Sequence, residues 1–248
     1  STLLASSAAS DVYKRQFFPK AYTLDHYKAL LSPDSVNQFP QWMLNTFIVA
    51  CFTCVISTLF VLMVAYAMSC MRFKARKPLM NIAIILNLFP GFLSMIAVYF
   101  IMKQFGLTGT LTGLIIVYSA GSGMGYLIAK GFFDTVSKSL RESAYLEGAN
   151  EFTVFWKIIL PLSKPICSVI AIFAINAAWS DFLLPYLVLR GSALQTVMVR
   201  LFVFSTEQTV NADTMMRSVV FSMIPPIILF FIFQKQLTEN AVSVGIKG

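Results

Sequence analysis

Five long stretches of this sequence contain almost no ionisable side chain, and this feature constrains the fold most strongly. The stretches are residues 35–71, 78–102, 104–129, 166–189, in which Asp181 is the single charge, and 218–234. A charged side chain in the hydrocarbon of a bilayer costs several kcal/mol, and a helix needs about 20 apolar residues to cross it. The stretches therefore predict five membrane-spanning α-helices, the first of them near residues 45–68.

The composition points to the same environment. Of the 248 residues, 57% are hydrophobic and 12% are charged, whereas soluble domains carry about a quarter charged residues. The net charge of +8 does not indicate nucleic acid, because no basic stripe is interleaved with aromatic side chains and membrane proteins acquire positive charge in their cytoplasmic loops. We therefore expect a lipid bilayer, and no nucleic acid, as a partner.

The basic residues between the spans predict the orientation. Eleven lie on one side of the predicted bundle: Arg72, Lys74, Arg76, Lys77, Lys130, Lys138, Arg141, Lys157, Lys164, Lys235 and Lys247. Six lie on the other side: Lys20, Lys28, Lys103, Arg190, Arg200 and Arg217. Because basic residues accumulate in cytoplasmic loops, the C-terminus is expected to be cytoplasmic.

The beginning of the chain is expected to differ from the rest. Residues 1–16 are small and polar and resemble translated adapter sequence, so we expect a non-native tail. Five spans that end in the cytoplasm must begin outside it, which makes residues 17–44 an extracytoplasmic segment and predicts a six-span parent with its first span upstream. The expected membrane domain is then 45–235, followed by a cytoplasmic tail at 236–248.

The longest predicted cytoplasmic loop, residues 130–164, has helical signals of its own. Ser139 and Glu142 fit a capping box, Gly148 is a natural helix stop, and Asn150 can cap a second helix. In that helix, four apolar residues recur with helical spacing: Phe152, Phe155, Trp156 and Ile159. Leu160-Pro161 is expected to end it. This pattern fits either a docking element or a connector that merely covers its own bundle.

The same loop carries a resemblance to a known family. Glu142-Ser143-Ala144-Tyr145-Leu146-Glu147-Gly148-Ala149, followed by Phe155, Ile158, Leu160-Pro161 and Pro165, resembles the EAA loop of binding-protein-dependent ABC importer permeases. Ser143 and Glu147 depart from the family's Ala and Asp but keep size class or charge. Further segments, at 88–94, 106–110, 130–133, 179–182 and 245–248, are similar to the maltose-type oligosaccharide permeases.

This resemblance implies a fold, partners and a site. The fold would be an all-α polytopic transmembrane helical bundle of the type I importer, MetI-like class in the bacterial inner membrane. The partners would be a second homologous permease, two cytoplasmic ABC ATPases that hold ATP and Mg, and an extracytoplasmic solute-binding protein that delivers a maltose-like or other oligosaccharide. The implied ATPase-coupling residues are Glu142, Ser143, Ala144, Glu147, Gly148, Ala149, Phe155, Ile158, Leu160 and Pro161.

Within this loop, the resemblance implies separate roles. Glu142 and Glu147 would supply charged contacts, Ala144 and Gly148 would permit close backbone approach, and Phe155 with Trp156 would anchor the loop to its own bundle.

Catalytic, metal and cofactor sites are not expected in this chain. It has no phosphate-binding loop, and its Gly121–Gly125 and Gly109–Gly113 segments are typical of close helix packing. The single His26 lies in a polar segment, and Cys51 and Cys54 lack the second Cys/His pair of a metal site. Import of an amino acid, polyamine or glycerol phosphate is the alternative function, and a membrane-embedded protease is the alternative of a different class.

Polar groups inside the spans are the candidates for a substrate path, because polarity facing hydrocarbon is costly. They are Asn87, Tyr99, Tyr126, Asn176, Trp179 and Asp181. Three proline sites are expected to kink or break their spans: Pro90, Pro185 and the pair Pro225-Pro226.

Overall fold

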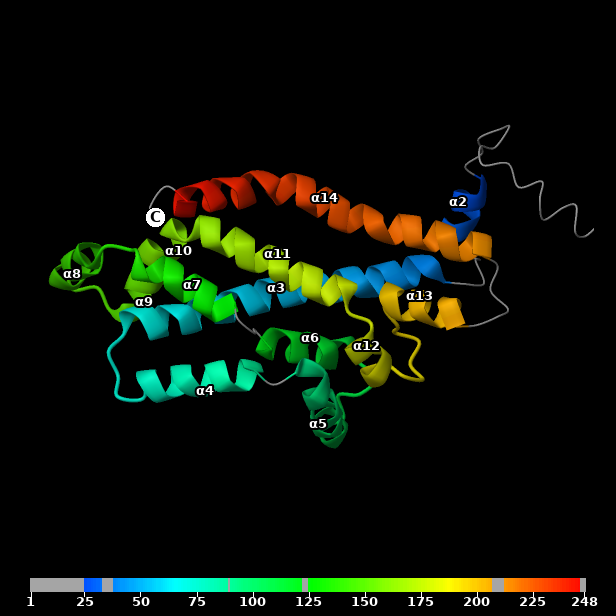
Figure 1. The fold of residues 1–248 in the computed structure, drawn as a ribbon, viewed down its shortest axis with the longest axis horizontal. Helices are drawn as coiled ribbons and strands as arrows, with labels where there is room; N and C mark the ends of the chain where they lie inside the picture. The colour runs from blue at the N-terminus through cyan, green and yellow to red at the C-terminus, as the bar shows by residue number, and fades with distance from the viewer. Residues whose placement is uncertain (1–24, 33–37, 89, 122–124, 207–211, 246–248) are drawn as a thin grey trace, which may run out of the picture.

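The computed structural model describes residues 25–32, 38–88, 90–121, 125–206 and 212–245, and the elements within these ranges are helices (Figure 1). The expected tail at 1–16 lies outside the described residues, as do residues 17–24 and 33–37 of the 17–44 segment. The described chain forms an elongated bundle in which the helices run roughly along one axis.

The central element is α3 (Phe39–Cys70), which packs against α6, α7, α11 and α13. Its 32 residues make it about 48 Å long at 1.5 Å per residue. It begins at Phe39, six residues before the predicted start at Asn45, because Pro40 is compatible with the first turn. Its N-terminal end is fixed by polar contacts: Asn45 donates to the Gln195 carbonyl at 3.0 Å, and the Thr46 hydroxyl accepts from the Val197 amide at 2.9 Å.

Two predicted spans are each built from two helices. The first pair is α4 (Arg76–Leu88) and α5 (Gly91–Gln104), which meet at 103°, so the break expected at Pro90 is confirmed. The second pair is α6 (Leu111–Ala120) and α7 (Gly125–Asp134), which meet at 44°. This span was predicted to start at residue 104, but residues 105–110 form a turn in which Gly106 and Gly109 have positive φ.

The predicted span at 166–189 is also interrupted, but at a different place from the one expected. The helix α11 (Lys164–Ser180) ends before Asp181, and a separate short helix α12 (Leu183–Val188) follows. Pro185 lies inside α12, so its expected break within the span is wrong. A further helix, α13 (Val197–Thr206), packs against α3.

The last helix, α14 (Ala212–Gly245), runs without interruption through Pro225 and Pro226, which contradicts the expected break. Pro226 has no N–H, so the Ser222 carbonyl loses its usual helical donor. In its place the Trp179 indole N–H of α11 donates to the Ser222 oxygen at 3.1 Å. A side chain from a neighbouring helix therefore satisfies the carbonyl that the proline leaves open.

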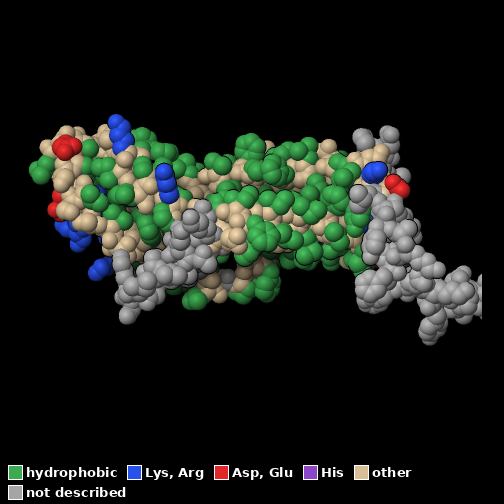
Figure 2. Space-filling view, turned by 90° about the horizontal axis from the view of Figure 1, so that it is seen from above, with side chains coloured by type: hydrophobic (Ala, Val, Ile, Leu, Met, Phe, Trp, Pro, Cys, Tyr) green, Lys and Arg blue, Asp and Glu red, His purple; other side chains and the backbone are tan. Residues whose placement is uncertain are grey.

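By length and composition, two of the described helices can cross a membrane, and up to five spans result if each bent pair counts as one. Figure 2 shows apolar side chains covering the middle of the bundle, while Lys, Arg, Asp and Glu gather towards its ends. Many large apolar side chains of α3, α4, α5 and α14 are exposed. The surface thus has the apolar band that lipid requires.

Candidate functional site

The 130–164 loop lies at one end of the bundle (Figure 1). After the end of α7 it contains α8 (Lys138–Leu146), α9 (Glu151–Val154), a π-helical turn (Phe155–Ile159) and α10 (Leu160–Leu162). It then bends by 82° into α11. The loop is therefore a folded helical unit, as the capping signals indicated.

The first cap was misplaced by the sequence analysis. The N-cap of α8 is Ser137, whose hydroxyl accepts from the Ser139 amide at 3.3 Å and lies 2.7 Å from the Ser139 hydroxyl. Because Lys138 is already helical, Ser139 is the second residue of the helix and cannot be its cap. The predicted capping box of Ser139 with Glu142 is therefore wrong.

The junction between α8 and α9 follows the prediction closely. Gly148 has φ +81°, its amide donates to the Tyr145 carbonyl at 3.0 Å, and the Ala149 amide donates to the Ala144 carbonyl at 2.9 Å. These two bonds form a Schellman motif, which needs a residue that tolerates left-handed backbone. The Asn150 side chain then caps α9 by accepting from the Thr153 amide at 2.8 Å.

The second helix differs from the predicted amphipathic helix. Its π-helical turn, Phe155–Ile159, inserts extra backbone into the turn, so α-helical spacing no longer reports one face. Phe155 and Ile159 are buried as expected, but Phe152 and Trp156 are 67% and 38% exposed. Trp156 is thus not a buried anchor, and fully buried Val154 takes that place. Pro161 does not end the helix, which continues to Leu162.

Two polar contacts fasten the loop to α3. The Tyr66 hydroxyl donates to the Glu151 carboxylate at 2.6 Å, and the Arg141 guanidinium donates to the Cys70 carbonyl at 2.7 Å. Cys70 is the last residue of α3, so Arg141 satisfies a carbonyl that the helix end leaves open. We name these two contacts the α3 clamp.

The residues of the clamp were missed by the sequence analysis. The available sequence signal was weak. Tyr66 lies near the end of an apolar run, and Glu151 and Arg141 lie in the 130–164 loop. Burial and the hydrogen bond with Glu151 also raise the pKa of the neighbouring Tyr145, so its phenol stays protonated at neutral pH and can share this contact.

The ten predicted coupling residues divide between two faces. Five are exposed: Glu142, Ser143, Glu147, Gly148 and Pro161. Five pack against or within the core of the bundle: Ala144, Ala149, Phe155, Ile158 and Leu160. Ala144 therefore faces its own bundle. Next to the exposed acids lie exposed apolar side chains, of which Leu146 is 89% exposed.

The six predicted path residues are not brought together. Asn87 and Tyr126 line one cavity of about 610 Å³, and Asn176 and Trp179 line another of about 130 Å³. Tyr99 lies on α5 beside the ring of Phe100. The indole N–H of Trp179 is already engaged with Ser222.

Asp181 has a structural role at the end of α11. Its carboxylate accepts from the Tyr118 hydroxyl at 2.9 Å and from the Leu183 amide at 2.9 Å. The first bond joins α6 to the end of α11, and the second satisfies the amide of the first residue of α12. Both hydrogen bonds to the carboxylate of Asp181 form at the break between α11 and α12.

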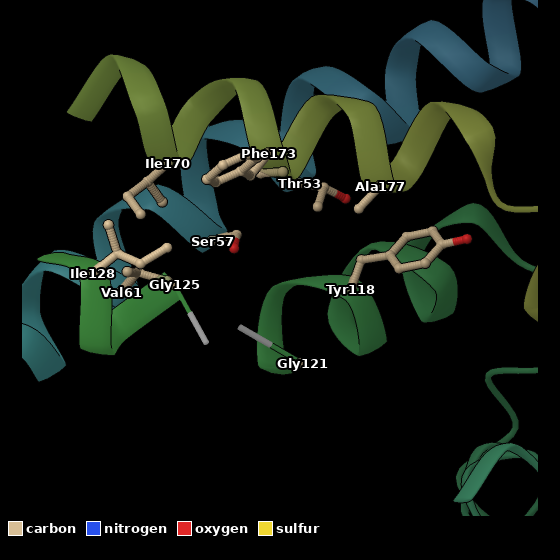
Figure 3. A pocket seen from close by; sticks show the side chains of 11 residues that line it. Thr53, Ser57, Val61, Tyr118, Gly121, Gly125, Ile128, Ile170, Phe173 and Ala177 are labelled. Carbon is tan, nitrogen blue, oxygen red and sulfur yellow. The ribbon is translucent and has the colours of Figure 1, made fainter. Parts of the chain in front are cut away.

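A cavity of about 350 Å³ between α3, α6, α7 and α11 was not predicted (Figure 3). Its polar lining comes from Thr53, Ser57 and Tyr118, beside the ring of Phe173. The Thr53 hydroxyl is buried and has no hydrogen-bond partner among the described residues. The available sequence signal was the pair of hydroxyl residues four positions apart on an otherwise apolar helix.

Comparisons with known proteins agree with this architecture. The family described as "Binding-protein-dependent transport system inner membrane component" matches residues 62–241. The chain is 32% identical over 232 residues to the galactooligosaccharides transport system permease protein GanQ of Bacillus subtilis, covering 93% of this chain and 82% of that protein. It is 31% identical over 226 residues to the maltodextrin transport system permease protein MalD of Streptococcus pneumoniae, covering 90% and 80%.

A solved structure is similar in fold. It is the crystal structure of a bacterial ABC transporter involved in the import of the acidic polysaccharide alginate, and one of its chains superposes with a TM-score of 0.75 at 24% identity. The superposition covers 85% of this chain and 78% of the other. The two chains thus share their overall fold.

Proposed function

Because the chain belongs to the binding-protein-dependent transport system inner membrane component family, we propose that it carries an oligosaccharide across the inner membrane as one of two permease subunits of an ATP-driven importer. The relatives named for galactooligosaccharide and maltodextrin transport support the sugar. The family consists of transport permeases rather than catalysts, which leaves a membrane-embedded protease without support.

In this proposal, two cytoplasmic ATPases bind ATP and Mg, and one of them docks on the 130–164 loop. The single observation that carries the docking role is the division of the loop into two faces. The exposed face presents Glu142, Glu147 and Leu146, while the other face is packed into the bundle. Phe152 and Trp156, whose rings contact each other, are exposed on the same loop, and exposed apolar side chains that lie together mark an interaction site.

The α3 clamp gives this docking face a mechanical connection. A force applied to α8 reaches α3 through the charge-assisted bond from Arg141, and a force applied to α9 reaches it through Glu151. Charge-assisted hydrogen bonds are about twice as strong as neutral ones. Closure of the ATPases would therefore move α3 together with the loop, and the extracytoplasmic binding protein would deliver the sugar at the opposite end, with the C-terminus on the ATPase side.

A matched pair of glycines tests the docking role. Gly148 lies on the proposed docking face and Gly191 lies in the turn after α12; both have positive φ, +81° and +77°, and a Cβ added at either would meet no atom within 4 Å. A Gly148→Trp variant should therefore carry the same backbone strain as Gly191→Trp, but only the first places a large ring between the loop and an ATPase.

The measurement is sugar-stimulated ATP hydrolysis and sugar uptake in proteoliposomes that contain both permeases, the ATPase and the binding protein. We expect Gly148→Trp to lose uptake by more than tenfold while Gly191→Trp keeps at least half of it. A Gly148→Asn variant should keep most uptake, because Asn tolerates left-handed backbone. Equal losses in the two Trp variants, or full uptake with Gly148→Trp, would contradict the docking role.

A further inference from the structure

The short connection between α3 and α4 is the most basic segment of the described chain. Residues 71–77, which we call the basic turn, contain Arg72, Lys74, Arg76 and Lys77 and no acid. Together with Phe73 and Met80, these four side chains line a hollow of about 750 Å³ at the bundle end that also carries the 130–164 loop. A hollow whose polar lining is entirely cationic is complementary to an anion.

The charge of the basic turn is only partly offset within the described structure, by the electrostatic interaction of Arg76 with Asp134. None of its four cations forms a salt bridge with a residue in the described ranges. The carboxylate of Asp134, at the end of α7, accepts from Ser69 at 2.6 Å and pairs with Lys130 at 2.6 Å. In addition, α4 begins at Arg76, so the positive dipole end of a 13-residue helix faces the same region.

A groove with an apolar wall lies beyond the hollow, between α4 and α3. Met80 lines the basic hollow, and Ala83, one helical turn further along α4, lines the cavity of about 610 Å³ described above. Val64 and Met68 form the α3 side of that cavity, and its polar lining comes from Asn87, Ser94 and Tyr126. The helix α4 buries none of its residues, and Leu86 is 64% exposed. A cationic hollow beside an exposed apolar helix matches a molecule with a phosphate head and a hydrocarbon tail.

We propose that the basic turn binds the phosphate of an anionic phospholipid, whose acyl chain lies along α4 in the groove towards α3. The charge pattern favours a lipid over a helix of another subunit, because an apolar helix offers nothing to neutralise four cations. A lipid site is also more than the positive charge that orients the chain in the membrane, because orientation needs basic residues on one side but no hollow and no groove. The site depends on embedding in a bilayer and not on the sugar or the ATPase docking proposed above.

The test compares lipids bound to the full chain purified in detergent, by native mass spectrometry with phosphatidylglycerol or phosphatidylcholine titrated separately. The variant is Arg72→Gln/Lys74→Gln/Lys77→Gln, and all three positions are exposed. The control is Lys138→Gln/Lys157→Gln/Lys164→Gln, which removes three exposed cations from the 130–164 loop at the same bundle end. A charge-preserving variant, Arg72→Lys/Lys74→Arg/Lys77→Arg, detects losses caused by misfolding.

One phosphatidylglycerol should bind saturably and more tightly than phosphatidylcholine. Because each juxtamembrane cation strengthens binding of an anionic lipid by roughly fivefold, the Gln variant should weaken it on the order of one hundredfold. The control and the charge-preserving variant should change it by less than about threefold. Equal weakening in the control would overturn the site in favour of general surface charge.

Two further arms identify the source of the phosphate. Inorganic phosphate and glycerol phosphate at millimolar concentration should leave the bound phosphatidylglycerol in place, since they lack the acyl chain; complete displacement by either would overturn the lipid. Displacement of the lipid when the second permease subunit binds would assign the hollow to a protein contact instead. A wild-type chain that binds no phosphatidylglycerol but supports normal sugar uptake would overturn this site alone, whereas failed uptake by a wild-type chain that binds the lipid would count only against the proposed transport function.

Discussion

The hydrogen bond from Trp179 to Ser222 makes a quantitative prediction about two paired helices. Pro226 removes the amide that would otherwise bond to the Ser222 carbonyl, and the Trp179 indole replaces it at 3.1 Å, with both residues about 5% exposed. A Trp179→Phe variant should therefore be destabilised for two reasons: the ring is smaller, and the Ser222 carbonyl has no donor. A Pro226→Ala variant restores the helical N–H donor to the Ser222 carbonyl, so the cost of the carbonyl without a donor should disappear in that background.

The expected coupling follows from the cost of an unsatisfied buried acceptor. That cost is about 1–3 kcal/mol in soluble proteins, and hydrogen bonds between membrane helices are worth about 0.6 kcal/mol on average and about 1.7 kcal/mol at most. The Trp179→Phe substitution should thus lower the free energy of unfolding by about 1 kcal/mol less in the Pro226→Ala background than in the wild-type background. The cost of the smaller ring is common to both backgrounds and cancels in the cycle.

The assay is reversible unfolding in mixed micelles of dodecyl maltoside and dodecyl sulfate, with the four proteins of the cycle measured together. The matched control replaces Pro226→Ala by Pro225→Ala, since Pro225 opens the carbonyl of Phe221 and not that of Ser222. The control cycle should be additive within about 0.3 kcal/mol. Additivity in the Pro226 cycle as well would show that the indole does not compensate for the missing amide.

Two other perturbations test the packing of the turns and the α3 clamp. A Cβ at Gly113 would lie 2.4 Å from a backbone oxygen of the preceding turn, so Gly113→Ala should lower the free energy of unfolding by about 1–3 kcal/mol. The same change at Gly131, where a Cβ would meet nothing within 4 Å, should be neutral or raise it by about 0.5–1 kcal/mol, and the micelle unfolding assay separates the two. Arg141→Gln should open the Cys70 carbonyl and speed hydrogen exchange in α8 by about tenfold, whereas Lys138→Gln should not; unchanged exchange would refute the clamp.

The apolar segments could be predicted from the sequence because hydrocarbon penalises ions whatever the tertiary contacts. The breaks within the segments could not, since they depend on partners from distant parts of the chain. Asp181 ends α11 because it gains donors from Tyr118, 63 residues away, and from Leu183. Conversely, α14 continues through Pro226 where local rules predict a break, and Trp179 supplies the missing donor.

The candidate site shows the same division. Gly148 and Asn150 were predicted correctly because a helix stop and a helix cap depend on backbone chemistry within a few residues. Ser137 and Ser139 are equally suitable caps by local sequence, and only the fold selects the first. The exposure of Trp156 could not be foreseen, because a π-helical turn changes the spacing on which the prediction rested.

The length of α3 gives the α3 clamp a geometric consequence. The helix is joined to the 130–164 loop at one end and contacts α2 (Asp25–Leu31) and α13 towards the other, about 48 Å away. A tilt of only about 5° about the clamped end displaces the opposite end of a rod of that length by about 4 Å, which is comparable with the width of a water molecule and larger than any hydrogen bond. In the coupling proposed above, such a rotation at the docking end would be enough to open or close a passage at the far end of α3.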